Sequence, residues 1–203
     1  MPAVPPVQQP FVRAASVGIP QGLVVDPASG EIGGAVRRGG ELVSLAQADY
    51  ELWVLLLTPL PFASIDGAAA RRGWVDVPSA IARLRDLSLL VTIAPGRKLD
   101  PAVARLRPLP LGVGIGNVGV DPNTFQIQNA SLSLPSPVCL DAIAIMFWWD
   151  FDGTASIGAV VERISARFQA VPRDAIENTA ACLARDLMAH RLLYLDTPPS
   201  EQA

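Results

Sequence analysis

The order of apolar and polar positions along this chain occurs twice. In residues 22–95 and again in 111–196, strand-like stretches come first, helix-spaced apolar residues follow, and a short apolar stretch ends the half. The matched landmarks are Val25-Asp26-Pro27 with Val120-Asp121-Pro122, Ser44-Leu45 with Ser133-Leu134, Ala63-Ser64-Ile65 with Ala155-Ser156-Ile157, and Leu89-Leu90 with Leu192-Leu193. A repeat of this kind predicts that both halves share one architecture.

The first half predicts three short strands, three helices and a closing strand. The strands are Gly22–Asp26, Ile32–Arg37 and Glu41–Leu45, the helices are Ala46–Leu57, Ile65–Arg72 and Val77–Ser88, and the closing strand is Leu89–Ala94. Tyr50, Trp53 and Leu57 recur at helical spacing and indicate a core-facing side. Pro59 and Pro61 end the first helix, because proline cannot continue the helical hydrogen bonding.

The second half predicts the same order. Its strands are Gly112–Val120, Thr124–Gln128 and Ser131–Leu134, its helices are Val138–Trp149, Ser156–Phe168 and Arg173–Arg191, and its closing strand is Leu192–Leu195. The helix Val138–Trp149 is apolar on nearly every side. Such a helix is typically buried, so Trp148 is expected in a core, as is Trp53 in the first half.

These elements predict an α+β fold of two domains in 203 residues. A Pro-rich N-terminal arm at 1–21 precedes the first domain (22–95), a basic linker at 96–110 precedes the second (111–196), and 197–203 is a tail. Only 17% of the residues are charged and 50% are hydrophobic, which is too little charge to cover two separate small domains. We therefore expect the two domains to share a buried surface or to pack on a partner.

Charge and cysteine content narrow the function classes. The net charge of −3 disfavours a polyanionic partner, and only the linker is basic, with Arg97, Lys98, Arg105 and Arg107 against Asp100. Two cysteines, Cys139 and Cys182, are too few for a disulfide framework. The N-terminus lacks the pattern of a secretory signal, and the longest apolar stretch, Ala142–Trp149, is too short to span a bilayer. A cytoplasmic location without membrane contact is expected.

Residues that could carry catalysis or bind a cofactor are sparse. The single histidine, His190, falls near the end of a predicted helix, and Cys182 lies about two turns (~12 Å) earlier, too far to form a Cys–His pair. The glycines at 114, 116 and 119 have the spacing of a dinucleotide loop, but a strand follows them instead of a helix. Asp150–Gly153 resembles the start of a calcium loop but lacks the closing glutamate. No catalytic residue, metal site or cofactor is predicted.

Basic residues form two small clusters on the helices predicted for the first half. They are Arg71-Arg72 and the pair Arg83 and Arg85. One interpretation is a solvated helix face, which is common in soluble proteins. The other is a contact surface for an acidic peptide or for phosphate groups.

The order of elements in each half resembles winged-helix domains, and resembles more closely the small PqqD-like peptide chaperones, also called precursor-peptide recognition elements. The residues that carry the resemblance are Gly40–Leu45, Ala63–Asp66 and Asp76–Leu90 in the first half, and Ser131–Leu134, Asp152–Ile164 and Leu183–Leu193 in the second. The tandem arrangement and the apolar helix Val138–Trp149 depart from that family's usual single unit.

In that family a peptide adds as an extra strand beside the third strand and packs on the third helix. The resemblance therefore implies one groove between Glu41–Leu45 and the helix that follows Asp76, and a second between Ser131–Leu134 and Arg173–Arg191. The candidate peptide-binding residues are Leu42, Ser44, Arg83, Leu87, Leu132 and Leu187.

The function expected from these observations is a non-catalytic, polypeptide-binding adaptor or chaperone that presents a peptide or protein to an enzyme or assembly. The alternatives are a winged-helix DNA-binding regulator, which the acidic balance disfavours, and a non-catalytic structural subunit of a larger complex. The expected partner is a protein or peptide, including a second copy of the chain, and nucleic acid is not expected.

Overall fold

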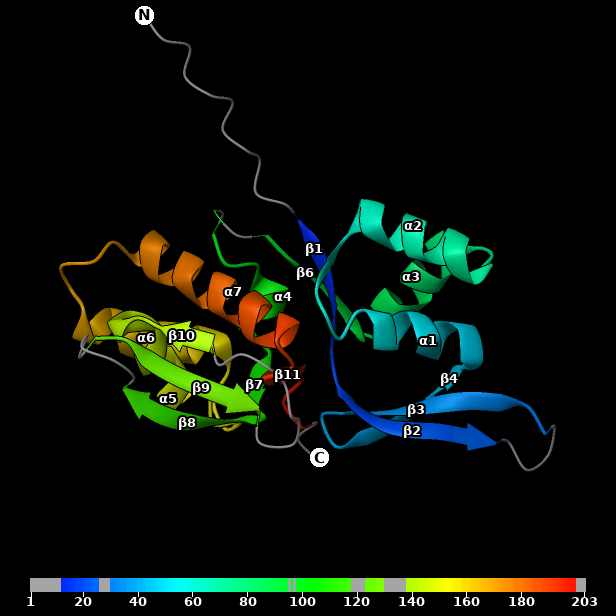
Figure 1. The fold of residues 1–203 in the computed structure, drawn as a ribbon, viewed down its shortest axis with the longest axis horizontal. Coiled ribbons are helices and arrows are strands. Elements are labelled where there is room, and N and C mark those ends of the chain that lie inside the picture. The colour runs from blue at the N-terminus through cyan, green and yellow to red at the C-terminus, as the bar shows by residue number, and fades with distance from the viewer. Residues whose placement is uncertain are drawn as a thin grey trace, which may run out of the picture.

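The computed structural model describes residues 12–25, 30–94, 96, 98–117, 123–129 and 138–199. Within these residues the chain is a mixed α+β protein with small antiparallel sheets and seven helices (Figure 1). In the first half, the three helices lie on one side of the three-stranded meander formed by residues 19–46 (Figure 1).

The first half contains two sheets and three helices. Its elements are β1 (Arg13–Ser16), β2 (Ile19–Val25), β3 (Ile32–Arg38), β4 (Glu41–Ala46), α1 (Gln47–Leu55), β5 (Leu60–Pro61), α2 (Phe62–Arg72), α3 (Val77–Asp86) and β6 (Leu90–Ile93). Strands β2, β3 and β4 form an antiparallel meander, and β1 lies between β5 and β6 in a second antiparallel sheet.

The second half has a similar order, with a helix added before its first strand and with no described counterpart of β5. Its elements are α4 (Pro101–Ala104), β7 (Arg107–Pro110), β8 (Gly112–Asn117), β9 (Phe125–Asn129), β10 (Val138–Leu140), α5 (Ala142–Asp150), α6 (Ile157–Arg167), α7 (Arg173–Ala189) and β11 (Leu193–Asp196). Strands β8, β9 and β10 form a meander, and β11 pairs with β7 as β6 pairs with β1.

The last helix of each half ends in the same way. Ser88 follows α3 with φ of 54° and Arg191 follows α7 with φ of 55°, so both adopt the left-handed conformation. The next amide then reaches back to the helix: Leu89 N–H donates to the Leu84 carbonyl at 2.8 Å, and Leu192 N–H donates to the Leu187 carbonyl at 2.8 Å. This is the helix-ending motif that turns the chain into a closing strand. It explains why the Leu-Leu landmark occurs twice.

The two halves share one buried surface. The core of the second half includes Ala15, Val17 and Ile93 from the first half. Hydrogen bonds join the halves as well, since Gly18 N–H donates to the Leu195 carbonyl at 2.7 Å and Gly39 N–H donates to Asp196 at 2.8 Å. The shared surface expected from the low charge content is therefore confirmed.

The expected core residues are also where the sequence placed them. Trp53 is fully buried and its indole N–H donates to the Val17 carbonyl at 3.0 Å. Trp148 is 8% exposed. Trp149, by contrast, is 62% exposed, so helix α5 is not buried on every side.

The segments predicted to be an arm and a linker are partly built into the fold. Strand β1 lies within the predicted arm, and its Ala14 and Ala15 are fully buried between β5 and β6. The predicted linker holds α4 and β7, and its Leu99, Val103 and Leu106 belong to the second core. Each segment supplies the strand that pairs with the closing strand of its half: β1 pairs with β6, and β7 pairs with β11.

Helix α5 begins later than the sequence predicts. Residues 138–140 form β10, and Asp141 then caps α5 by accepting hydrogen bonds from the amides of Ile143 (3.0 Å) and Ala144 (2.8 Å). The predicted strand Ser131–Leu134 and the two Val-Asp-Pro landmarks fall wholly or partly outside the described residues. Among the helices that the structure describes, none has the length and apolar character needed to cross a membrane.

Candidate polypeptide-binding surface

The sheet β2–β3–β4 leaves large apolar side chains in contact with solvent. Leu23 is 67% exposed, Val25 63%, Ile32 50% and Leu42 67%. One face of this sheet packs on α1, because Gly34 lies directly against the ring of Tyr50 and a side chain there would overlap that ring. Leu23 pairs with Gly34, so Leu23 and the pair Val25 and Ile32 point to this face, beyond the part that α1 covers. Leu42 points to the opposite face, which α1 does not cover.

The strand register explains how the outer face is built. Gly34 pairs with Leu45, which is buried toward α1, while the next pair, Ala35 and Ser44, points to the opposite face. Small residues along β3 leave a groove between the longer side chains of β2 and β4. The groove has a volume of about 550 Å³, and its lining includes Val24, Ile32, Ala35, Leu42 and Ser44.

Strand β4 is an open edge of this sheet. It pairs with β3 on one side, and no described strand pairs with its other side. Unpaired backbone donors and acceptors on an edge strand can pair with another extended chain. The groove and the open edge together form the surface that we call the β4 surface, defined by the groove lining and strand β4.

The structure divides the predicted site residues of the first half into two groups. Leu42 and Ser44 both line the β4 surface. Arg83 instead makes two hydrogen bonds to Asp49 of α1, at 2.7 and 2.8 Å, and these bonds raise the pKa of its guanidinium. Leu87 is 37% exposed, and its carbonyl accepts a hydrogen bond from Arg38. Arg83 and Leu87 therefore fix α3 to α1 and β3, apart from the groove lining.

The two predicted site residues of the second half do not identify a peptide-binding surface there. Leu187 is fully buried in the second core and has no surface to present to a peptide. Leu132 lies outside the described residues.

The second half nevertheless has exposed apolar residues of its own, which the sequence analysis missed. Val113 and Ile115 on β8 are 52% and 48% exposed, and the exposed Trp149 contacts Phe125 edge-on with ring centroids 6.0 Å apart. The alternation Gly-Val-Gly-Ile-Gly at 112–116 was the available signal, because alternate residues of a regular strand share a face. In the structure a register shift between Gly114 and Gly116 interrupts the regular pairing of β8 with β9.

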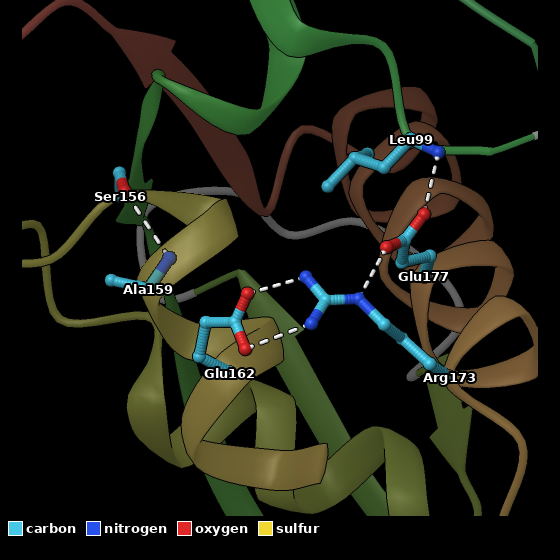
Figure 2. A network of polar contacts seen from close by, with 6 residues as sticks. All are labelled: Leu99, Ser156, Ala159, Glu162, Arg173 and Glu177. Carbon is cyan, nitrogen blue, oxygen red and sulfur yellow. Dashed lines mark hydrogen bonds and ion pairs between the residues drawn. The ribbon is translucent and has the colours of Figure 1, made fainter.

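The buried charged groups of the second half stabilise the fold. Glu177 is 3% exposed and accepts hydrogen bonds from the Leu99 amide (3.1 Å) and from Arg173 (2.9 Å). Arg173 also forms an ion pair with Glu162 of α6, so the network joins α6, α7 and the segment before α4 (Figure 2). The bond from Arg173 is the main reason that the pKa of Glu177 is lowered, against the opposing effect of burial.

The groups considered for catalysis and metal binding lie apart from one another. His190 is exposed at the end of α7, and burial raises the pKa of the Cys182 thiol, which keeps it protonated. In the described part of the chain, no group of three or more His, Cys, Asp or Glu side chains could hold a metal ion.

Comparison with known proteins finds similarity only among solved structures, which include two of the same protein. No protein-family model and no curated protein match the chain. The solved structure of PKMT2 from Rickettsia typhi aligns with 11% identity and a TM-score of 0.38, and PKMT2 in complex with AdoHcy aligns with 12% identity and a TM-score of 0.34. Each alignment covers 91% of this chain and 42% of the other, so the chain spans about two fifths of the length of the chains it matches.

These alignments correct the predicted function. The predictions of a non-catalytic adaptor, of a DNA-binding regulator and of a non-catalytic subunit all excluded an enzymatic role, whereas one of the aligned structures is PKMT2 in complex with AdoHcy. The prediction that the chain is not an enzyme is corrected by the same finding. With these identities and TM-scores, the alignments assign no reaction, substrate or cofactor to this chain.

Proposed function

We propose that this chain recognises an extended polypeptide segment by strand addition at the β4 surface. The observation that carries the proposal is the coincidence of an open edge strand and an exposed apolar groove on the same three-stranded sheet. Binding of this kind is compatible with a catalytic protein, for which the polypeptide is either a substrate or a partner.

Two physical arguments support the proposal. An added strand would pair its backbone with the free edge of β4, which supplies affinity without regard to sequence, and alternate side chains would reach the groove, which supplies specificity. Monomeric proteins rarely leave several large apolar residues together in solvent without an interaction to explain them. Leu42, on β4 itself, is 67% exposed and lines the groove.

The chemistry of the groove favours a polypeptide over nucleic acid. Its described lining is mostly apolar and contains no Arg or Lys, the residues that bind phosphate backbones. A protein or peptide partner, including a second copy of the chain, fits such a surface. A cytoplasmic location is part of the same proposal.

The finer architecture is proposed on the same basis. We infer that each half is a winged-helix-like unit and that the first half corresponds to the PqqD-like resemblance. The shared order of a pairing first strand, a three-stranded meander, three helices and a closing strand supports this.

Selection of peptides from a random library on the immobilised chain tests the proposed function. A selected peptide is titrated against the wild type and against Leu42→Asp, which places a charge in the groove. The matched control is Val75→Asp, because Val75 is 86% exposed and lies outside the groove lining. We expect at least a tenfold weaker affinity for L42D, an unchanged affinity for V75D, and slower amide exchange along β4 when the peptide is bound.

Two outcomes would refute the proposal. One is that no peptide is selected. The other is that selected peptides bind L42D and V75D equally well and leave the exchange of β4 amides unchanged.

A further inference from the structure

A cavity of about 600 Å³ lies between the two halves of the chain. Its walls come from the end of α3, the start of β6, the segment of α4, the first residue before α6, and the segment that follows β11. The volume is in the range of small-molecule sites, which are commonly found where two domains meet. This cavity is separate from the β4 surface, since no lining residue is common to both.

Two arginines line the cavity, and neither is neutralised by an acid. Arg85 lies over the ring of Phe62 at 5.5 Å, and Arg105 donates to the Pro101 carbonyl at 3.2 Å. No carboxylate of the described residues pairs with either guanidinium, and the described lining contains no Asp or Glu. The described lining therefore carries two positive charges and no negative one, in a chain whose net charge is −3.

Hydroxyl groups from three separate segments supply further donors. Ser88, Ser156 and Thr197 all line the cavity. Ser156 accepts a hydrogen bond from the Ala159 amide at 3.2 Å, so its own hydroxyl hydrogen remains available to donate. Ser156 also caps the eleven-residue helix α6, whose positive end therefore adds to the field of the two arginines.

The rest of the wall is apolar. Leu90 and Leu106 are 5% and 4% exposed, and Val91 and Pro198 extend the same surface. A ligand that fills the cavity would thus meet guanidinium and hydroxyl donors together with aliphatic carbon.

We propose that this inter-domain cavity, lined by Arg85, Arg105 and Ser156, binds a small molecule that carries a phosphate group on an apolar body. Guanidinium groups, hydroxyl donors and a helix N-terminus are the groups that proteins use to bind phosphate. The aliphatic wall selects for the non-polar part of the ligand. Because the wall is shared by both halves, the bound ligand holds them together.

Calorimetric titration with two probes, inorganic phosphate and phenyl phosphate, tests the site. We expect both to bind, and phenyl phosphate to bind more tightly because its ring covers the aliphatic wall. Arg85→Gln and Arg105→Gln should each weaken phenyl phosphate binding at least tenfold, since each removes a charge-assisted donor. Arg71→Gln is the matched control, because Arg71 is exposed, has no described ion pair and lies outside the cavity.

Benzoate tests whether a carboxylate can replace the phosphate group, and it should bind more weakly than phenyl phosphate. Backbone amide shifts of Leu90 and Ile157 in NMR spectra report whether the probe occupies this cavity. The proposal is overturned if neither phosphate probe binds at millimolar concentration, if R71Q weakens binding as much as R85Q and R105Q, or if the shifts occur elsewhere. Tighter binding of benzoate would also overturn the assignment to phosphate.

Discussion

Replacement of Glu177 by glutamine should destabilise the protein more than replacement of Glu162, although both carboxylates bind the same arginine. Glu177 is buried, whereas the side chain of Glu162 is 60% exposed. The Glu177 carboxylate accepts hydrogen bonds from Arg173 and from the Leu99 amide, and the substitution removes its charge while it keeps the side-chain shape. The two variants therefore compare a buried carboxylate with an exposed one that binds the same arginine.

The expected magnitudes follow from this environment. A hydrogen bond to a charged group contributes about 1.5–3 kcal/mol, and Glu177→Gln should lower the free energy of unfolding by about this amount. An exposed ion pair contributes below about 1 kcal/mol, which is the loss expected for Glu162→Gln. For a chain of this size each kcal/mol shifts Tm by roughly 2–4 °C, so thermal unfolding followed by circular dichroism resolves the two variants.

The difference between wild type and E177Q should also depend on pH. The pKa of Glu177 is lowered in the folded protein, so at falling pH the unfolded chain takes up the proton first. Its contribution is complete at pH 7, begins to decrease near the ordinary glutamate pKa of about 4.3, and is lost once the pH passes below the lowered folded value. Equal losses for E177Q and E162Q at pH 7, or a difference that persists undiminished to pH 2, would contradict this reasoning.

Two further substitutions test the core and the helix ends. Trp53→Ala should lower the free energy of unfolding by about 3–5 kcal/mol, measured by chemical denaturation, because Trp53 is fully buried. Trp149→Ala, at a position that is 62% exposed, should lower it by less than about 1 kcal/mol. A loss for Trp53→Ala as small as that for Trp149→Ala would place Trp53 outside the core. Arg191→Gly should stabilise the protein by about 1 kcal/mol, because φ at Arg191 is 55° and glycine adopts this conformation without strain. His190→Gly is the control and should destabilise the protein, because φ at His190 is −94°. A loss of stability in R191G would contradict the proposed strain.

The order of helices and strands could be predicted because it depends on local patterns. The apolar spacing of Tyr50 and Trp53 indicates α1, and the helix predicted over Ser156–Phe168 is observed as α6, which Ser156 caps. Asp141 was also a readable signal, since an aspartate before an apolar stretch is a common helix cap. It was missed because the apolar run continues through 138–140, and these residues are as suitable for a strand as for a helix.

Strands β1 and β7 could not be predicted in the same way. Each has four residues, and β1 is stabilised by pairing with β6, from which more than 70 residues separate it. Such short segments carry no periodicity, and their extended conformation depends on a partner that the local sequence does not reveal. The same reason explains why the predicted arm and linker include buried residues.

The candidate site shows the same division between local and long-range information. Leu42 and Ser44 are candidates because the family resemblance identifies the strand beside which a peptide would add, and both residues line the groove. Their neighbours Val24 and Ile32 depend on the pairing of β2 with β3, which the sequence predicts as a hairpin but whose register and outer face it does not show. The sequence predicts that Arg83 binds a peptide, because it does not reveal that Arg83 pairs with Asp49 of α1.

The low charge content of the chain is explained by where its apolar residues lie. Both cores are built from helices and from the inner faces of the sheets, and the shared surface buries only small side chains from β1 and the residue after it, together with Ile93. Among the described residues, the exposed Leu42 on β4 and Val113 and Ile115 on β8 belong to neither core. Their exposure supports the polypeptide recognition proposed above, for which the open edge of β4 supplies unpaired backbone groups.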